Sequence, residues 1–395
     1  MKRIRGIVLG VSAAVVAALF VTWGAFPSPA VHAAVKAPAK GETVPVFQYD
    51  ATWPKDLPKN WTVGSVVGVS VDTKDHIWIV HRPSTLVGSE KAATSNPPQG
   101  ECCAPAPAII EFDQAGNYIQ GFGGPGEGYE WPHTALQAVS CCEHGMYVDA
   151  KGNVWTGTNA RDGGQVLKFT HDGKFLLQIG RATKSTGSND TSSMGAPAGL
   201  EVDAKANELY VADGYVNRRV IVYDAETGAY KRHWGAYGSK PDDTPFRYEA
   251  GAPLPKQFGN PVHCARITRD ELVYVCDRSN NRIQVFHKDG TFVKEGQVAP
   301  QSKGSGAVHD IGFSADKDQR FVYVTDAANS KVWILRRDDL KVIGSFSRGG
   351  HFGGQMIMPH SMAVDSKGNV YVGESLEGKR VQRFLYKGTT TVAVP

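Results

Sequence analysis

The sequence lacks several features that define common protein classes. No segment carries a long apolar repeat of 3.6 residues, which excludes a helical solenoid. The net charge of +4 is small for 395 residues, and part of it lies in the N-terminal leader. The composition therefore does not indicate a basic surface that binds nucleic acid. Beyond that leader, no apolar run resembles a membrane span. We therefore expect no nucleic-acid partner, and no membrane contact once the leader is removed.

The N-terminal leader has the order of an export signal. A positively charged start precedes an uncharged run over residues 7–21, and small residues follow near Ala33. We expect residues 1–33 to be a signal peptide and the Ala/Pro/Lys-rich residues 34–45 to be a linker, in a secreted or periplasmic protein. An uncleaved anchor is the alternative. The absence of a cysteine near the end of the run argues against a lipoprotein.

Cysteine is scarce, with six residues, and export would place them in a compartment that permits disulfides. Two adjacent pairs lie in an insertion over residues 84–107 and just before His144. We expect two disulfides between these pairs, and the alternative is a thiol or vicinal-disulfide feature beside a metal site. The two single cysteines face each other if a hairpin is centred on Asp270, which predicts a cross-strand disulfide or a thiol contact. The six residues are Cys102, Cys103, Cys141, Cys142, Cys264 and Cys276.

Glycine and proline are abundant, with 44 and 22 residues, as expected for many short strands joined by tight turns. One pattern recurs six times: a strand ending in Asp, a Gly-Asn or charged turn, a second strand, and then two more strands. Residues 146–155 and 362–371 are its clearest copies. Four strands per unit predict an all-β, six-bladed β-propeller over residues 46–388. We expect the orphan strand Val44–Asp50 to complete the last blade, which closes the ring and removes free sheet edges. We expect a monomer.

Histidine recurs at one position of this repeat, the start of the first strand. His144, His263 and His360 occupy it in units two, four and six, and His309 occupies it in unit five. First strands line the channel of a propeller, and alternate blades of six are ~120° apart. Three imidazoles that converge in this way suit a Zn²⁺ ion with an open fourth position, as at a catalytic zinc. His309 is a candidate fourth ligand, a partner of a ligand, or a substrate contact. The alternative is that His is simply a favoured polar residue at the channel mouth.

Several motifs identify a closer resemblance. Residues 275–286, Val-Cys-Asp-Arg-Ser-Asn-Asn-Arg-Ile-Gln-Val-Phe, resemble NHL repeats. Over residues 64–384 the chain is also similar to the peptidyl-α-hydroxyglycine α-amidating lyase family, whose members are six-bladed propellers of this type. The Asp-Gly-Tyr and His-Arg matches are the most specific, because a generic repeat protein has no reason to keep them. The similarity is carried by Gly68–Asp72, Ile79–Arg82, His144 to Asn153, Ala212–Arg219, Pro261 to Gln284, and Met358–His360.

The resemblance implies a zinc-dependent carbon–nitrogen lyase. Its zinc ligands map onto the three histidines, its catalytic tyrosine onto Tyr215, and its basic substrate-site residues onto Arg82 and Arg278. The implied reaction splits a carbinolamide, N–CH(OH)–COO⁻, into an amide and glyoxylate. Zinc would lower the pKa of the bound hydroxyl, Tyr215 as phenolate would accept its proton, and an arginine would hold the carboxylate. For Tyr215 the alternative is a packed turn aromatic. For Arg278 it is the ordinary repeat arginine, paired with a neighbouring blade.

The sequence departs from the family in two respects. Ser361 stands where the family has an acidic residue that helps to hold a structural calcium, so a calcium ion is in doubt. Asp310, one blade earlier in the same register, is a candidate replacement. No hydroxylating copper domain accompanies the lyase-like region, so the substrate is either a small molecule or a peptide. Two other functions stay open: a metal-dependent propeller hydrolase such as a lactonase, and a non-catalytic NHL-repeat scaffold that binds a partner.

Overall fold

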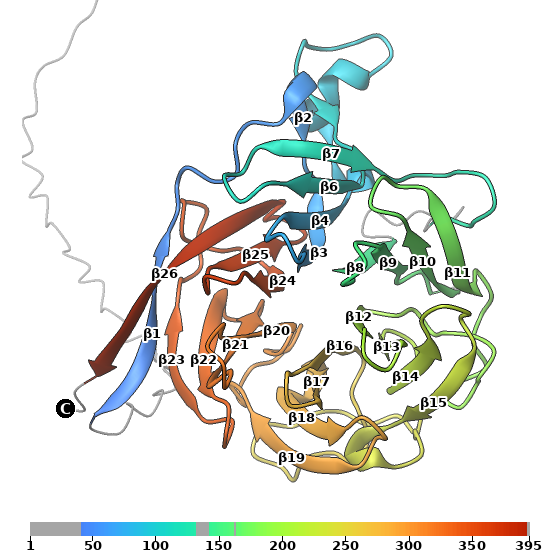
Figure 1. The fold of residues 1–395 in the computed structure, drawn as a ribbon, viewed down its shortest axis with the longest axis vertical. Coiled ribbons are helices and arrows are strands. Elements are labelled where there is room, and N and C mark those ends of the chain that lie inside the picture. Colours follow the sequence, from blue (N-terminus) through green and yellow to red (C-terminus); the bar gives the residue numbers. More distant parts are fainter. Residues whose placement is uncertain (1–40, 132–141, 162, 393–395) are drawn as a thin grey trace, which may run out of the picture. The chain divides into compact units, whose positions relative to one another are not determined.

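In this computed structural model, residues 41–131, 142–161 and 163–392 are described. The expected signal peptide, 1–33, and most of the expected linker, 34–45, lie outside these residues. Six four-stranded antiparallel sheets are arranged around a central axis, as Figure 1 shows. The prediction of an all-β, six-bladed propeller is therefore confirmed. Within the described residues no helix is both long enough and apolar enough to cross a bilayer.

The first three blades follow one another along the chain, each running from the axis outward. Blade one contains β3 (Ser65–Val71), β4 (Ile77–Arg82), β6 (Ile109–Phe112) and β7 (Tyr118–Phe122). Blade two contains β8 (Glu143–Val148), β9 (Val154–Thr158), β10 (Gly164–Phe169) and β11 (Phe175–Arg181). Blade three contains β12 (Gly199–Asp203), β13 (Glu208–Asp213), β14 (Arg219–Asp224) and β15 (Tyr230–Trp234).

The remaining blades complete the ring. Blade four contains β16 (Val262–Ile267), β17 (Leu272–Asp277), β18 (Arg282–His287) and β19 (Phe292–Gln297). Blade five contains β20 (Asp310–Phe313), β21 (Phe321–Asp326), β22 (Lys331–Arg336) and β23 (Val342–Phe346). Blade six contains β24 (Pro359–Val364), β25 (Val370–Glu374), β26 (Arg380–Val392) and β1 (Glu42–Tyr49).

Short elements decorate the ring. A two-residue parallel pair joins β2 (Trp61–Thr62) to β5 (Ala104–Pro105) in the insertion of blade one, which projects from the ring at the top of Figure 1. The 3₁₀ turns are η1 (Pro58–Asn60), η2 (Pro83–Thr85), η3 (Gly88–Thr94), η4 (Ala236–Gly238) and η5 (Arg278–Asn280).

Blade six is closed by strands from the two ends of the described chain. β1 pairs antiparallel with β26, from Glu42 opposite Val392 to Tyr49 opposite Phe384. The orphan strand predicted at Val44–Asp50 therefore completes the last blade as expected. Such closure hydrogen-bonds the first and last strands to each other and stabilises the ring.

The recurring Asp-x-x-Gly-Asn pattern forms the hairpin between the first two strands. In blade two, one oxygen of Asp149 accepts hydrogen bonds from the backbone N–H groups of Lys151 and Asn153, both at 2.9 Å. Its other oxygen accepts the indole N–H of Trp155 at 2.9 Å. Gly152 has φ +81°, a conformation that favours glycine. The turn chemistry therefore explains why this motif repeats along the chain.

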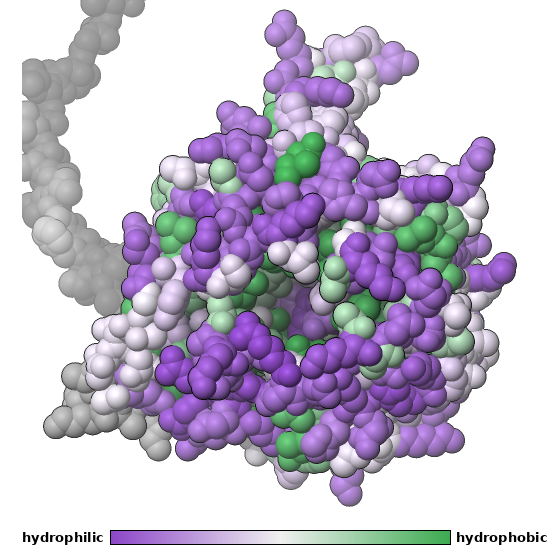
Figure 2. Space-filling model, in the orientation of Figure 1, coloured by the Kyte–Doolittle hydropathy of each residue, from purple (hydrophilic) through white to green (hydrophobic). Residues whose placement is uncertain are grey.

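The core consists of apolar clusters between adjacent blades. Each cluster joins side chains of two neighbouring sheets, and one of them joins Ile79 of blade one to Tyr371 of blade six. Sheets packed face to face around the full circle fix the inner strands at the axis. Figure 2 shows the resulting hollow at the centre of one face of the molecule.

Cysteine pairing differs in part from the prediction. Cys264 and Cys276 form the cross-strand disulfide expected in blade four, where they face each other in the strand pair. Cys102 and Cys103 are bonded to each other, so the predicted disulfides from the insertion to the loop before His144 are wrong. The physical reason is that the insertion folds on itself, with the backbone N–H of Ala93 donating to the carbonyl of Cys103. Cys142 is also in a disulfide, and Cys141 lies outside the described residues.

Candidate metal centre at the channel

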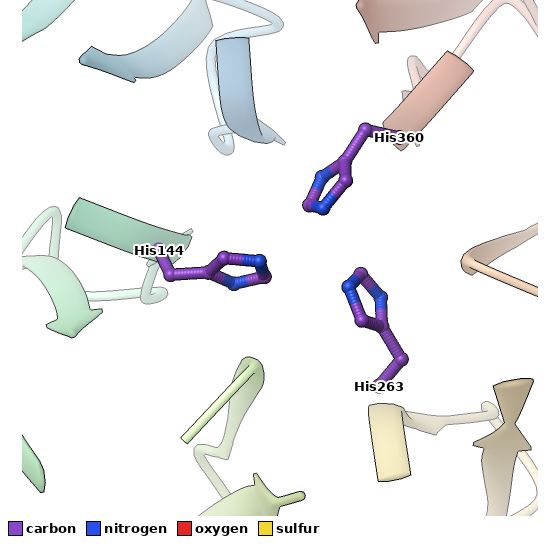
Figure 3. A group of neighbouring side chains, drawn as sticks. All are labelled: His144, His263 and His360. Carbon is purple, nitrogen blue, oxygen red and sulfur yellow. The ribbon is translucent and has the colours of Figure 1, made fainter. Parts of the chain in front are cut away.

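Three imidazoles from alternate blades converge at the axis, as Figure 3 shows. His144 comes from β8, His263 from β16 and His360 from β24. Their ring centroids are 5.1, 4.8 and 4.7 Å apart, and one nitrogen of each ring lies within 4.8 Å of the others. Three imidazoles bound tetrahedrally to one ion at ~2.1 Å would have centroids about 5 Å apart. The geometry therefore fits a single bound metal ion.

Irregular strand pairing directs these side chains toward the axis. The register of β16 against β17 shifts at His263, and that of β24 against β25 shifts at His360. In β8 the shift falls one residue later, at Gly145. A β-bulge turns side chains away from the ordinary alternation of a strand and is frequent beside functional sites. The repeat pattern predicted the position of the histidines, but it carries no signal for the bulges.

Backbone carbonyls of the next blades set the orientation of two of the rings. His144 Nδ1 lies 2.6 Å from the carbonyl oxygen of Ala198, and His263 Nδ1 lies 2.5 Å from that of His309. A carbonyl can only accept, so Nδ1 carries the proton and the lone pair is on Nε2. His360 Nδ1 is buried and has no hydrogen-bond partner among the described residues. His144 and His263 therefore present a lone pair on Nε2, the form of imidazole that binds metals.

Burial also keeps these rings neutral. Loss of solvent is the main cause that holds the pKa of His144, His263 and His360 well below the ordinary value. The positive charges of Arg82 and Arg278 lower the pKa of His144 and His360 further. A metal ion competes with protons for imidazole, so neutral rings favour binding.

Tyr215 lies at the centre of this arrangement. Its hydroxyl oxygen is 3.0 Å from His144 Nε2 and 3.1 Å from His263 Nε2, so it marks the point toward which the two lone pairs are directed. Arg278 Nη1 donates to the same oxygen at 3.2 Å, and its guanidinium centre lies 5.5 Å from the ring centroid. Tyr215 is therefore next to any ion that the rings bind.

The two arginines occupy different positions. The repeat arginine that forms the buried ion pair of blade four is Arg282, at 2.6 Å from Asp277, whereas Arg278 reaches Tyr215. The structure thus distinguishes Arg278 from the ordinary repeat arginine. Arg82 is buried at the end of β4 and donates from Nε to the carbonyl of Glu143 and from Nη2 to Asn159, both at 2.9 Å. Sequence reasoning missed these two supports, because neither residue recurs in the repeat.

His309 stands beside the cluster and outside it. Its ring centroid is 5.4 Å from that of His263 and 5.8 Å from that of His360. Both ring nitrogens are buried without a hydrogen-bond partner among the described residues, while its carbonyl orients His263. The residue therefore orients the ring of His263 through its backbone, while its own imidazole is buried without a polar partner among the described residues.

A calcium ion held by Asp310 does not fit the channel. Both carboxylate oxygens of Asp310 accept hydrogen bonds from Arg266, at 2.9 and 2.7 Å, and also from the backbone N–H groups of Ile311 and Met362. Calcium requires oxygen lone pairs from several ligands, and these are occupied. Ser361 offers no carboxylate either. A buried guanidinium therefore takes the place of a cation at this level of the channel.

The fold and the cluster define the class of protein: a six-bladed propeller with three convergent histidines in its channel. The sequence is 26% identical over 338 residues to peptidyl-glycine alpha-amidating monooxygenase B of Xenopus laevis, covering 83% of this chain and 34% of that protein. It is 25% identical over 361 residues to peptidyl-alpha-hydroxyglycine alpha-amidating lyase 1 of Drosophila melanogaster, covering 86% and 60%. It is 24% identical over 353 residues to NHL repeat-containing protein 3 of Mus musculus, covering 86% and 84%.

These similarities confirm the predicted resemblance: the chain has homologues among the amidating lyases and among NHL repeat-containing proteins. It spans about a third of the length of the Xenopus protein and 60% of the Drosophila protein. No family model matches the chain. A crystal structure of a protein of unknown function from Bacteroides thetaiotaomicron has a similar fold, with a TM-score of 0.51 and 11% identity, covering 88% of this chain and 77% of that one.

Proposed function

We propose that the chain is an exported, metal-dependent lyase that cleaves an N-acyl-α-hydroxyglycine, a carbinolamide, into an amide and glyoxylate. The observation that carries the proposal is the convergence of three neutral imidazoles, two of which contact the hydroxyl of Tyr215, with Arg278 beside it. The relationship to amidating enzymes supports the same chemistry. The substrate is a small molecule or a peptide.

We assign the metal to His144, His263 and His360. The donor set of three imidazoles with one open position is the set that catalytic zinc takes. When bound there, the ion supplies Lewis acidity, which lowers the pKa of an oxygen ligand and favours loss of its proton.

The residues of the chain carry the proton and hold the substrate. Tyr215, as phenolate, accepts the proton of the substrate hydroxyl, and the guanidinium of Arg278 stabilises its negative charge at 3.2 Å. The electron pair left on oxygen forms the carbonyl of glyoxylate as the C–N bond breaks. The amide nitrogen then takes up a proton, so no oxidant or reductant is needed. A positioned acid–base group of this kind contributes typically ~10²–10⁴-fold to the rate.

The carboxylate of the substrate requires a cation, and two are at hand. Arg82 is fixed by hydrogen bonds to Glu143 and Asn159, and Arg278 faces Tyr215. Guanidinium binds carboxylate through two parallel hydrogen bonds, which orients the substrate as well as holding it. We assign the unpartnered imidazole of His309 to a contact with the acyl or carboxylate group.

The disulfides support the proposed location. Cys264–Cys276 and Cys102–Cys103 are typical of proteins that fold in an oxidising compartment. We therefore propose a secreted or periplasmic enzyme, acting as a monomer without nucleic-acid or membrane partners.

The test is release of glyoxylate from an N-acyl-α-hydroxyglycine by the purified protein, with bound metal measured in parallel. We expect release by the wild type, loss after chelation, and recovery with Zn²⁺. His144→Ala should lose both metal and activity, whereas His233→Ala, at a half-buried position on β15 away from the axis, should keep both. Bound metal without glyoxylate release would favour the alternative function, a metal-dependent hydrolase of the lactonase type. Absence of metal from the wild type would contradict the proposal.

A further inference from the structure

A second group of metal-ligating side chains lies between blades one and two. Asp72 follows β3, His76 precedes β4, Glu111 lies in β6, and His171 lies in the turn between β10 and β11. The channel histidines stand near the beginning of the inner strands, whereas Asp72 stands at the far end of one. This group, which we call the interblade cluster, therefore belongs to a different part of the fold.

The contacts within the interblade cluster are close. Both imidazoles point at one oxygen of Glu111: His76 Nδ1 lies 2.7 Å from Oε1, and His171 Nε2 lies 3.2 Å from it. The nearer oxygen of Asp72 is 4.0 Å from His76 Nδ1. Ligand atoms of Asp72, Glu111 and His171 all lie within 4.8 Å of one another. Donor atoms from three hairpins thus lie close enough to bind one ion, and His76 joins them through its contact with Glu111.

The two carboxylates of the interblade cluster have no lysine or arginine partner among the described residues. Several other buried carboxylates are paired with arginine, as Asp213 is with Arg219 at 2.8 Å and Glu374 is with Arg380 at 2.7 Å. The side chain of Glu111 is fully buried and that of Asp72 is 6% exposed, yet within the described part of the chain their ion-pair partners are the two imidazoles. Two buried carboxylates whose ion-pair partners are imidazoles alone lack the full positive charge that an arginine would supply. One divalent cation would balance them.

Neighbouring side chains hold the ligands in place. Gln120 Nε2 donates at 2.8 Å both to the second oxygen of Glu111 and to the carbonyl of His171, so it links the blade-one strand to the blade-two turn. The indole N–H of Trp78 donates to Asp72 at 3.2 Å, and the ring of Trp78 meets that of His171 edge to face at 5.1 Å. Such outer hydrogen bonds orient ligands at metal sites.

We propose that Asp72, His76, Glu111 and His171 bind one divalent transition-metal ion of the Zn²⁺ type. Imidazole and carboxylate are ligands that zinc accepts, whereas calcium and magnesium prefer oxygen alone. His76 and His171 are 27% and 43% exposed, so the ion has a path from solvent. Because its ligands come from two blades, the ion cross-links them. The proposal is independent of the activity assigned to the channel.

The test is the number of Zn²⁺ ions retained per chain after loading and dialysis, measured by elemental analysis. We expect His76→Ala/His171→Ala to retain one ion fewer than the wild type. The exposed His287, in blade four, gives the matched control, because His287→Ala should retain the wild-type number. The channel variant His144→Ala should keep the ion of the interblade cluster, which separates this site from the proposed active site.

A second measurement, the change in Tm on adding Zn²⁺, keeps the test valid if the double variant folds poorly. Saturating Zn²⁺ should raise the Tm of the wild type by about 4 °C more than that of His76→Ala/His171→Ala, the shift expected at a hundredfold excess over Kd. The conservative variant His171→Gln should behave like the double variant, because an amide is a poor zinc ligand. Equal ion counts, or equal Tm increments, in wild type and double variant would overturn the proposal.

Discussion

Replacing Glu201 by glutamine should abolish a pH dependence of stability that originates in the channel. Glu201 lies in β12, and its carboxylate accepts the backbone N–H of Ile267 at 3.1 Å. The nearest cation is Arg266, 3.6 Å away, but that guanidinium already makes two hydrogen bonds to Asp310. Tyr147 also faces this group. One cation therefore serves two buried carboxylates.

Burial raises the pKa of Glu201 from 4.5 to about 7, and Asp310 adds to the increase, while Arg266 opposes it. The folded protein holds a proton that the unfolded chain releases above pH 4.5. The stabilisation is therefore fully present below pH 4.5 and is lost as the pH rises through 7. The shift of about 2.5 units corresponds to roughly 3 kcal/mol of stability lost by pH 8.

The assay compares the Tm of Glu201→Gln and wild type at pH 5 and pH 8. Glutamine keeps the size and the acceptor for Ile267 but cannot ionise. About 2.5 kcal/mol of this change falls between pH 5 and pH 8, so the advantage of the variant should grow by about 3 °C, taking about 1.3 °C per kcal/mol for a chain of this size. The exposed Glu249 supplies the control, since Glu249→Gln should show no such change. If the difference in Tm between variant and wild type is the same at both pH values, ionisation of Glu201 does not cause the pH dependence.

Further predictions concern the site and the disulfide of blade four. Tyr215→Phe should lower kcat for glyoxylate release by about 10²–10⁴-fold and keep the channel metal, whereas the exposed Tyr230→Phe should change neither; an unchanged kcat would remove Tyr215 from acid–base catalysis. Arg278→Ala should lower kcat and raise KM together, because one guanidinium faces both Tyr215 and the substrate carboxylate, and an effect on Tm alone would make it structural. Cys264→Ala/Cys276→Ala should lower the free energy of unfolding by about 3 kcal/mol in guanidinium denaturation, since the bond closes a loop of 12 residues; an unchanged midpoint would contradict this.

The repeat pattern predicted the ring and the direction in which its histidines face. It did so because each blade is a local unit, and its turns, such as that of Asp149, are formed by residues that follow one another in the sequence. Closure by the strand near Val44 followed from the three clear strands of the sixth unit. The propeller geometry then placed residues that are far apart in the sequence, such as His263 and His360, at one axis.

Other features depended on contacts that no local pattern encodes. The pairing of Cys102 with Cys103 follows from the way the insertion folds on itself. The ion pair of Arg266 with Asp310 forms between blades four and five, and it replaces a cation that the resemblance implied. The interblade cluster assembles from three hairpins of two blades, so its members share no motif.

The most direct test of the channel site is anomalous diffraction at the zinc edge from crystals of the Zn²⁺-loaded protein. We expect a peak in the channel about 2.0–2.1 Å from one ring nitrogen of each of His144, His263 and His360, with the oxygen of Tyr215 beside it. A channel without a peak, or a peak that fewer than three of these rings touch, would contradict the claim that they bind one ion.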